Sequence, residues 1–159
     1  MKLYGNVGHQ LDMLLETISG LDDDIYRLRN GERSSVGAHV RHVVECLQIL
    51  EQASEGSVID FSHRQRNKQL EVDKALVCME IKRLKGSLLR KENFELQVSN
   101  DGDLFDTTFH RELLAQHEHL VHHCAIIKIQ LTDCCDKPLN PHLGMAKSTL
   151  EYNKTNVSA

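Results

Sequence analysis

The sequence predicts an all-α fold, a single domain built as a bundle of four long helices. Three observations support this prediction. Apolar residues recur at intervals of three and four along most of the chain, which is the pattern of helices buried on one face. Only two prolines and nine glycines occur in 159 residues, so helix breakers are few. The length suits one domain, and a hydrophobic content of 40% is enough for one core of ordinary size.

The first helix is expected at residues 3–18 and the second at residues 35–54. Ser34 or Ser35 can cap the second helix by accepting a hydrogen bond from its first turn, and Gly56 follows its end. The apolar positions are Val7, Leu11, Leu14 and Ile18 in the first helix, and Val36, Val40, Val43, Leu47 and Leu50 in the second.

A long polar crossover, residues 60–69, leads to the third helix, expected at residues 72–90. The fourth helix is expected at residues 109–133 and is the longest periodic segment of the chain. The expected core positions are Ala75, Leu76, Met79, Leu84 and Leu88 in the third helix, and Leu113, Leu120, Cys124, Ile127 and Leu131 in the fourth.

A small β-hairpin is expected between the third and fourth helices. Residues 94–98 alternate between polar and apolar side chains, and Asn100-Asp-Gly is a turn signal before a returning strand at residues 104–108. The tail from Pro138 onward is expected to be loop-like, with one turn of helix near residues 148–152 and disorder over 151–159. The whole chain, residues 1–159, is expected to be one domain.

The composition excludes several classes of protein. A net charge of −4 and a pI near 6.2 argue against a nucleic-acid-binding surface. No apolar run approaches the roughly 20 residues of a membrane span, and the N-terminus lacks the plan of a secretory signal. The five cysteines form neither a CxxC zinc motif nor a disulfide framework. These features predict a cytoplasmic protein with reduced thiols and neither a nucleic-acid nor a membrane partner.

The unusual feature of the composition is its ten histidines, in a chain without tryptophan. His119 and His123 are four residues apart, so they lie on the same face of the fourth helix, beside its core stripe. Two imidazoles at this spacing can reach one metal ion. His122 is turned about 100° away by the helix period, toward solvent.

Two ligands rarely hold a divalent ion, so a third is expected from another helix. His39 and His42 both lie within the apolar arc of the second helix. A buried imidazole needs a partner, because burying a polar group unpaired costs about 1–3 kcal/mol. A metal ion, a carbonyl or a carboxylate can serve, so the alternative is a set of hydrogen-bonded core histidines. The HExxH pattern of zinc peptidases is absent, because Leu120 follows His119.

Three blocks of sequence resemble the DinB/YfiT-like superfamily of small proteins. Ser34-Ser-Val-Gly-Ala-His-Val-Arg-His42 is similar to Ser-Ser-Ile-Gly-x-His-x-Arg-His in one branch of that family. His119-Leu-Val-His-His123 with the following Cys-Ala-Ile-Ile is similar to His-Thr-Ile-His-His-Tyr-Ala-Leu-Ile. Leu143-Gly-Met-Ala-Lys-Ser-Thr-Leu150 is similar to Phe-Gly-Val-Ala-Pro-Ser-Thr-Leu. The likeness covers roughly residues 7–150, and it departs from the family at Cys124 and Lys147, where the family has Tyr and Pro.

The resemblance implies a four-helix bundle with up-down-down-up topology and a divalent metal ion held by three histidines. Carried over to this sequence, the ligands are His42, His119 and His123, with His39 as the alternative to His42. Some relatives are transferases or isomerases that present a low-molecular-weight thiol to the metal, and others are DNA-damage-inducible proteins of unknown activity. Zn, Ni, Fe and Mn all accept imidazole ligands, so the metal itself is not predicted.

Such a site leaves an open position at which bound water or a thiol becomes a nucleophile near neutral pH. The predicted function is therefore that of a metal- and thiol-dependent transferase or hydrolase acting on a small electrophilic substrate. Two alternatives remain. One is a non-catalytic bundle in which the ion ties the second helix to the fourth, and the other is an interaction module that forms a homodimer.

Other polar residues near these histidines have weaker predicted roles. A basic group would help to hold an anionic thiol, but Arg41 and Arg111 are expected to be solvated surface charges. Glu45 follows His42 by three residues and could orient a ligand imidazole, although the helix period places it on the polar side.

The cysteines are expected to be mostly inert. Cys46 and Cys124 are predicted to be small core residues, with a fourth, thiolate ligand as the alternative. Cys134 and Cys135 are expected to be partly exposed and without a role, because neighbouring cysteines close a strained ring.

Overall fold

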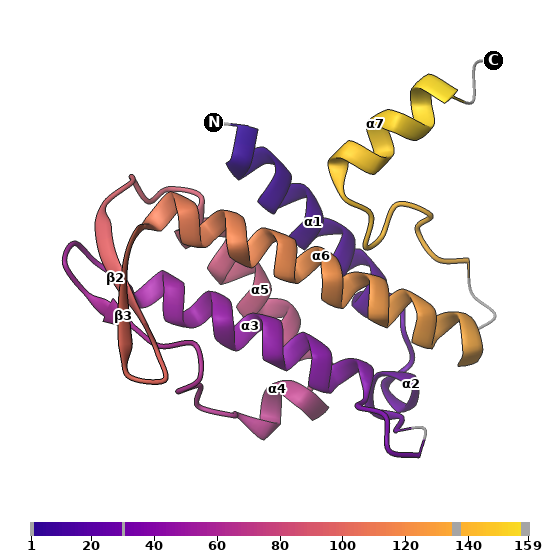
Figure 1. The fold of residues 1–159 in the computed structure, drawn as a ribbon. Helices are drawn as coiled ribbons and strands as arrows, with labels where there is room; N and C mark the ends of the chain where they lie inside the picture. The colour runs from indigo at the N-terminus through magenta and orange to yellow at the C-terminus, as the bar shows by residue number, and fades with distance from the viewer. Residues whose placement is uncertain (1, 30, 135–137, 157–159) are drawn as a thin grey trace.

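The structure is a computed structural model that describes residues 2–29, 31–134 and 138–156. Over these residues the chain is mostly helical, with one small three-stranded sheet (Figure 1). The predicted helical class is confirmed, although the sheet means that the fold is not purely α-helical. The elements are α1 (Lys2–Ser19), α2 (Asp23–Arg27), α3 (Val36–Gln52), β1 (Val58–Ile59), α4 (Lys68–Val72), α5 (Lys74–Leu88), β2 (Glu95–Asn100), β3 (Asp103–Thr108), α6 (Phe109–Cys134) and α7 (Lys147–Asn156).

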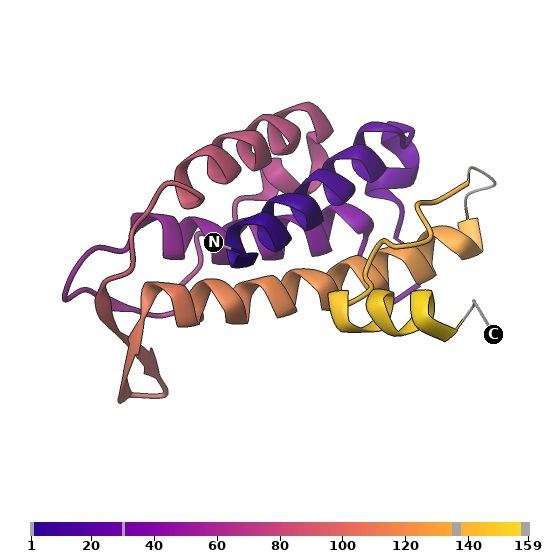
Figure 2. The same cartoon turned by 90° about the horizontal axis from the view of Figure 1, so that it is seen from above.

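The four longest helices of the described residues, α1, α3, α5 and α6, pack side by side (Figures 1 and 2). Helices α1 and α6 run in one direction along the bundle, and α3 and α5 run in the other. Side-chain contacts agree with this arrangement. Gln48 on α3 donates to Glu80 on α5 (2.7 Å), and further along both helices Ser87 donates to Glu51 (2.7 Å). Helices α3 and α6 are therefore antiparallel neighbours, which matters for the site described below.

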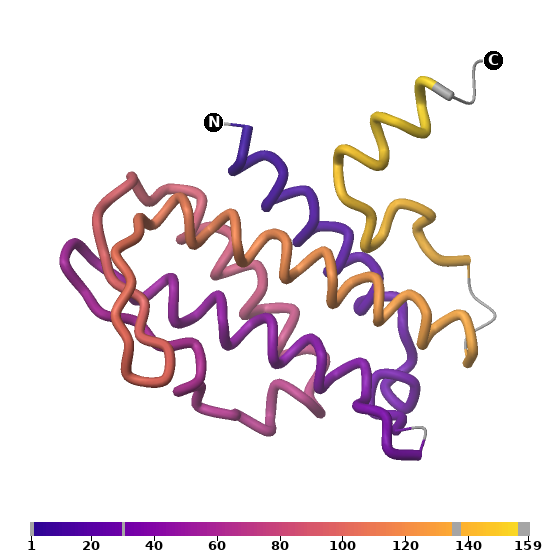
Figure 3. The backbone as a smooth tube through the Cα atoms, viewed as in Figure 1, coloured from indigo at the N-terminus to yellow at the C-terminus, as the bar shows by residue number. Residues whose placement is uncertain are grey.

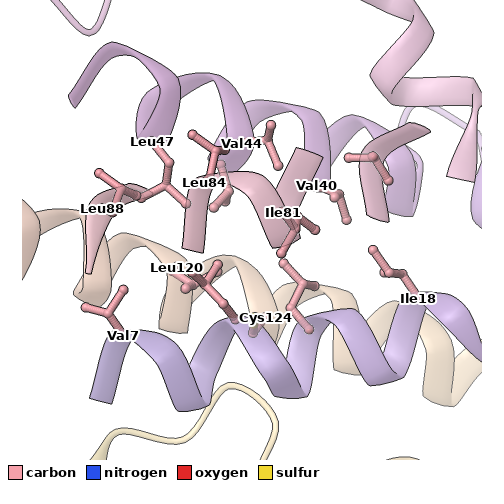
Figure 4. Close-up of a cluster of buried hydrophobic side chains, with 14 of the residues drawn as sticks. Val7, Ile18, Val40, Val44, Leu47, Ile81, Leu84, Leu88, Leu120 and Cys124 are labelled. Carbon is pink, nitrogen blue, oxygen red and sulfur yellow. The ribbon is translucent and has the colours of Figure 1, made fainter. Parts of the chain in front are cut away.

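One hydrophobic core fills the space between these helices (Figure 4). Each long helix contributes a stripe of aliphatic side chains whose exposed fraction is close to zero. Burying a Val, Leu or Ile side chain contributes roughly 1.5–3 kcal/mol, so this cluster supplies the main stabilisation of the fold. The labelled members are Val7 and Ile18 on α1, Val40, Val44 and Leu47 on α3, Ile81, Leu84 and Leu88 on α5, and Leu120 and Cys124 on α6.

The four long helices were all predicted, with ends that differ by two residues or fewer from those observed. Ser35 is the residue that caps α3, and its Oγ accepts a hydrogen bond from the amide of Ala38 (3.1 Å). Asp73 caps α5 in the same way, accepting from the amide of Leu76 (2.9 Å).

The core face predicted for the third helix is wrong in its first half. Ala75, Leu76 and Met79 are exposed, whereas Val77 and Ile81 are buried. The buried set repeats at intervals of four, three and four and so keeps to one face of the helix, whereas the predicted set contains a gap of five. That buried set is Val77, Ile81, Leu84 and Leu88.

The predicted hairpin is confirmed as β2 and β3, with Leu96 opposite Thr107. Its turn contains Asp101 and Gly102, both with positive φ (51° and 91°), as the Asn-Asp-Gly signal indicates. The sequence did not predict β1, which adds to β2 in parallel and pairs Val58 with Gln97. A two-residue strand carries no detectable periodicity, so this pairing has no sequence signal.

The crossover between α3 and α5 contains β1 and α4 and passes along α3 (Figure 3). Tyr26 of α2 is fully buried and its hydroxyl donates to the carbonyl of Leu70 on α4 (2.8 Å). Arg64 and Asn67 lie on the connection that leads into α4. The crossover therefore places Arg64 next to α3, with its Nε atom 4.0 Å from Oε2 of Glu45.

The tail contains more helix than predicted, because α7 spans ten residues where one turn was expected. Residues 157–159 lie outside the described residues. Gly144 precedes α7 with a positive φ (71°), and a Cβ at this position would collide with the backbone of Ala125 on α6. The tail thus touches α6 at Gly144, and α7 extends away from that contact (Figure 3).

Within residues 2–29, 31–134 and 138–156, no helix is both long and apolar enough to span a membrane.

Candidate metal centre

Helices α3 and α6 bring four histidines into one cluster, here called the histidine cluster. His39 and His42 come from α3, and His119 and His123 come from α6. All four are half-buried, on faces that border the core. Because the two helices are antiparallel neighbours, His42 meets His119 and His39 meets His123.

His42 and His119 approach each other at a distance that suits two ligands of one metal ion. Their Nε2 atoms are 3.1 Å apart. Two nitrogen ligands of a tetrahedral ion, each about 2.05 Å from it, are separated by about 3.3 Å. Cys46 lies one turn beyond His42, and its Sγ and one nitrogen of each of these histidines all lie within 4.8 Å of one another. These three residues form a His/Cys/His group at metal-binding distance.

His123 joins this group through its ring. Its centroid is 4.6 Å from that of His119 and 4.8 Å from that of His42, and the latter two centroids are also 4.8 Å apart. The three imidazole rings predicted as ligands are therefore neighbours, although the group whose ligand atoms all lie within 4.8 Å of one another consists of His42, Cys46 and His119. His39 is farther out, but its Nδ1 is 3.1 Å from Nδ1 of His123.

The cluster favours neutral imidazoles. Burial, followed by the charge of Arg64 and by neighbouring imidazoles, lowers the pKa of His42 to about 4. Burial, followed by the other three histidines of the cluster, lowers the pKa of His123 to about 3. Burial also lowers the pKa values of His39 and His119. Neutral imidazole is the form that binds a metal, so these side chains need not lose a proton at neutral pH.

Two glutamines orient the cluster. The Oε1 atom of Gln116, which is buried on α6, accepts a hydrogen bond from Nδ1 of His119 (3.3 Å). This bond puts the proton on Nδ1 and leaves the lone pair on Nε2, directed at His42. The Nε2 atom of Gln130 donates to the carbonyl of Ser34 (2.9 Å) and lies 3.4 Å from Nε2 of His39. The hydrogen bond between Gln116 and His119 is of the kind that fixes the tautomer of metal-binding histidines.

Cys46 is buried, as predicted for a core residue, but it faces the histidine cluster. Burial raises the pKa of its thiol to about 11, against opposing effects of the Arg64 charge and of a hydrogen bond from Arg64. The thiol is therefore protonated at neutral pH. Cys124 is fully buried in the core, where burial likewise raises its pKa to about 11.

The expectation that Glu45 lies on a polar face is wrong, because its exposed fraction is 2%. Its Oε1 atom accepts from the amide of Asn67 (2.5 Å), and Nε of Arg64 is 4.0 Å from its Oε2 atom. The helix period gave the wrong environment because the crossover covers this side of α3.

Arg41 is also not the surface charge that was expected, since only 17% of its side chain is exposed. It forms an ion pair with the buried Glu71 of α4 (3.3 Å). Arg111 is exposed, as expected. The basic residue that contacts the His/Cys/His group is instead Arg64, which donates a hydrogen bond to the Cys46 thiol. Sequence reasoning missed it because a loop has no periodicity to place it.

The remaining histidines and cysteines lie outside the group. His122 is exposed, as the helix period predicts. His117 lines a separate cavity between α1, α6 and α7. Cys134 is half-buried and its Sγ donates to the carbonyl of Gln130 (3.2 Å), whereas Cys135 lies outside the described residues.

No protein-family model matches this chain, and neither does any curated protein or solved structure.

The residues present fit a divalent cation. Neutral imidazoles are intermediate ligands that suit Zn, Ni, Fe and Mn. The separation of the His42 and His119 nitrogens matches two adjacent coordination positions. Two further potential ligands, His123 and Cys46, lie next to this pair.

Proposed function

We propose that the chain is a DinB-like metal-binding protein that holds one divalent ion between α3 and α6. The observation that carries this proposal is the 3.1 Å distance between Nε2 of His42 and Nε2 of His119. The two residues belong to two antiparallel helices. The directions of the four long helices also support it. Helices α1 and α6 run opposite to α3 and α5, which is the up-down-down-up topology that the family resemblance implies.

The proposed ligands are His42, His119 and His123. His123 is preferred to Cys46 as the third ligand because its imidazole is already neutral, whereas the Cys46 thiol must release a proton at a pKa of about 11. His39 is then an outer group that contacts the ligand His123 through Nδ1. This set leaves one position of a four-coordinate ion for water or a small molecule.

The chemistry that fits this site is transfer or hydrolysis at a small electrophile. A divalent ion, when bound, favours the thiolate form of a small thiol, or the hydroxide form of water. The nucleophile forms a bond to the electrophilic carbon while the leaving group departs with the bonding electrons. The proton that the thiol or water releases passes to solvent. The chain's own contribution is to present neutral imidazoles and, through Gln116, to orient His119. Reduced thiols of this kind belong to the cytoplasm, the proposed compartment.

A second function is favoured by the position of Cys46. If its Sγ takes the fourth position beside His42 and His119, the ion has no open site and only ties α3 to α6. Such a closed site is typical of structural zinc. The alternative that the chain is an interaction module that forms a homodimer also remains a proposal, and no contact among the described residues specifically supports it.

Cobalt substitution separates the two functions. An open three-histidine site should show sulfur-to-metal charge-transfer absorption only after a small thiol is added. A closed site should show this absorption without added thiol, and Cys46→Ser should remove it. Protein that acquires no cobalt would contradict both functions.

A further inference from the structure

Arg64 brings a positive charge to the histidine cluster from outside the bundle. It lies on the crossover between β1 and α4, and 20% of its side chain is exposed. Its guanidinium contacts the Cys46 thiol, the residue that shares the His/Cys/His group with His42 and His119. Its Nη1 atom donates to the carbonyl of Phe61.

The carboxylate nearest to Arg64 neutralises it incompletely. Glu45 Oε2 is 4.0 Å from Nε of Arg64, which is an ion pair but too long for a hydrogen bond. The other oxygen of Glu45 is occupied by the amide of Asn67.

The second buried carboxylate near the site is already shared among several cations. Glu71 lies within ion-pair distance of Arg29 (2.9 Å), Lys68 (3.1 Å) and Arg41 (3.3 Å). It therefore has little charge left to balance anything else. The four imidazoles of the cluster contribute no negative charge, because an imidazole is either neutral or positively charged in this pH range.

A divalent ion at this site would consequently stand beside a guanidinium with too few carboxylates to balance both. Two positive centres in a half-buried site repel each other unless an anion lies between them. A guanidinium has five N–H donors, and they match the geometry of a carboxylate. The carbonyl of Phe61 and the thiol of Cys46 account for two of these donors.

We propose that Arg64 makes the metal centre selective for an anionic small-molecule ligand, by binding the ligand's negative group while another atom of the ligand takes the open metal position. This inference rests on the proposed function, because it requires a metal ion held by the histidine cluster. Arg64 is then a specificity-determining residue that touches the ligand and leaves the metal ligands unchanged.

The test uses two probe thiols, mercaptopropionate and mercaptopropanol, which carry a carboxylate and a hydroxyl group on the same carbon chain. Cobalt-loaded full-length protein is titrated with each, and the charge-transfer absorption reports binding. Because a charge-assisted pair with arginine is lost in the neutral probe, mercaptopropionate should bind about tenfold or more tightly. In Arg64→Gln the two probes should bind equally, with the cobalt content unchanged.

The matched control is Arg66→Gln, which removes the same charge from an exposed position on the same crossover. It should keep the preference for mercaptopropionate. If Arg64→Gln fails to fold because Glu45 is left buried without its partner, the double variant Glu45→Gln/Arg64→Gln removes both charges and should show the same loss of preference.

Three results would overturn the inference. Equal affinity for both probes in the wild-type protein is one, and a preference that survives in the Arg64 variants is another. The third is charge-transfer absorption before any thiol is added, because the Cys46 thiolate would then be the anion beside Arg64. Failure to bind cobalt at all is a different outcome from these three, because it would contradict the proposed metal centre and, with it, this inference.

Discussion

Gln116 holds the His119 ring in the tautomer that a metal ligand needs. Replacing it with leucine removes the acceptor for Nδ1–H, so His119 can rotate or exchange its tautomer. Loss of such an orienting partner typically lowers metal affinity by about 10–100-fold. We expect a reduction of this size in Gln116→Leu, measured by competition with a chromophoric chelator. Unchanged affinity in a folded variant would show that Gln116 does not orient a ligand.

Single histidine variants on one helix test which face binds the ion. His123→Ala should abolish stoichiometric binding of zinc, because two imidazoles rarely hold a divalent ion. His122→Ala is the matched control, since His122 is adjacent in sequence but exposed, and it should bind normally. Titration calorimetry provides the measurement. Equal losses in the two variants would mean that the wrong face of α6 has been assigned.

The residues of the site differ in how far the sequence could predict them. His119 and His123 follow from a four-residue spacing on one helix, and the family resemblance selected His42 from two candidates. Gln116 also carries a signal, because it precedes His119 by three residues and faces the same side, but this was not recognised. Arg64 has no such signal, because its approach to α3 depends on how the crossover folds.

At the level of elements, α3 and α4 approach each other closely at Gly37, because this residue has no side chain. A Cβ at Gly37 would collide with the carbonyl oxygen of Glu71 and approach a ring carbon of Tyr26 to 2.9 Å. Gly37→Ala should therefore lower the free energy of unfolding by about 1–3 kcal/mol, the usual effect of overpacking. Gly86→Ala, in α5, has no neighbour within 4 Å and should instead stabilise the protein by roughly 0.5–1 kcal/mol.

Urea denaturation of both variants gives the comparison. If Gly37→Ala unfolds at the same urea concentration as the wild-type protein, the close packing of α4 on α3 is not present in solution. That result would also remove the basis for placing Arg64 beside the histidine cluster, because α4 begins at Lys68, shortly after Arg64.

Helices were predictable where one apolar stripe dominates, as in α1, α3 and α6. The prediction failed for the first half of α5, where apolar residues such as Leu76 and Met79 stand outside the buried stripe. Periodicity alone cannot choose between overlapping faces; the neighbouring elements decide. The same limit explains β1 and the burial of Glu45, because both depend on contacts between distant segments.

At the level of the whole molecule, the histidine cluster links stability to pH. The folded-state pKa values of His42 and His123, about 4 and about 3, lie below the unfolded value, which is about 6.5. The unfolded chain therefore binds more protons than the folded chain below this pH. The free energy of unfolding of the metal-free protein should be greatest above about pH 6.5 and should fall as the pH decreases toward 4.

This fall is measured by urea denaturation between about pH 7 and pH 5, a range chosen because the carboxylates remain largely ionised. A variant that replaces His42 with glutamine removes one of the responsible groups, so its stability should depend less on pH. A wild-type stability that is constant or rises over this range would contradict the buried, neutral state of these imidazoles.

The central claim is that one divalent ion binds between α3 and α6 through His42, His119 and His123. Its most direct test is elemental analysis of full-length protein purified without a histidine tag or a nickel column, alongside His119→Ala and His122→Ala. We expect about one equivalent of a divalent transition metal in the wild-type protein and in His122→Ala, and almost none in His119→Ala. Wild-type protein that is free of metal and does not take up added zinc would contradict it, as would equal metal content in all three proteins.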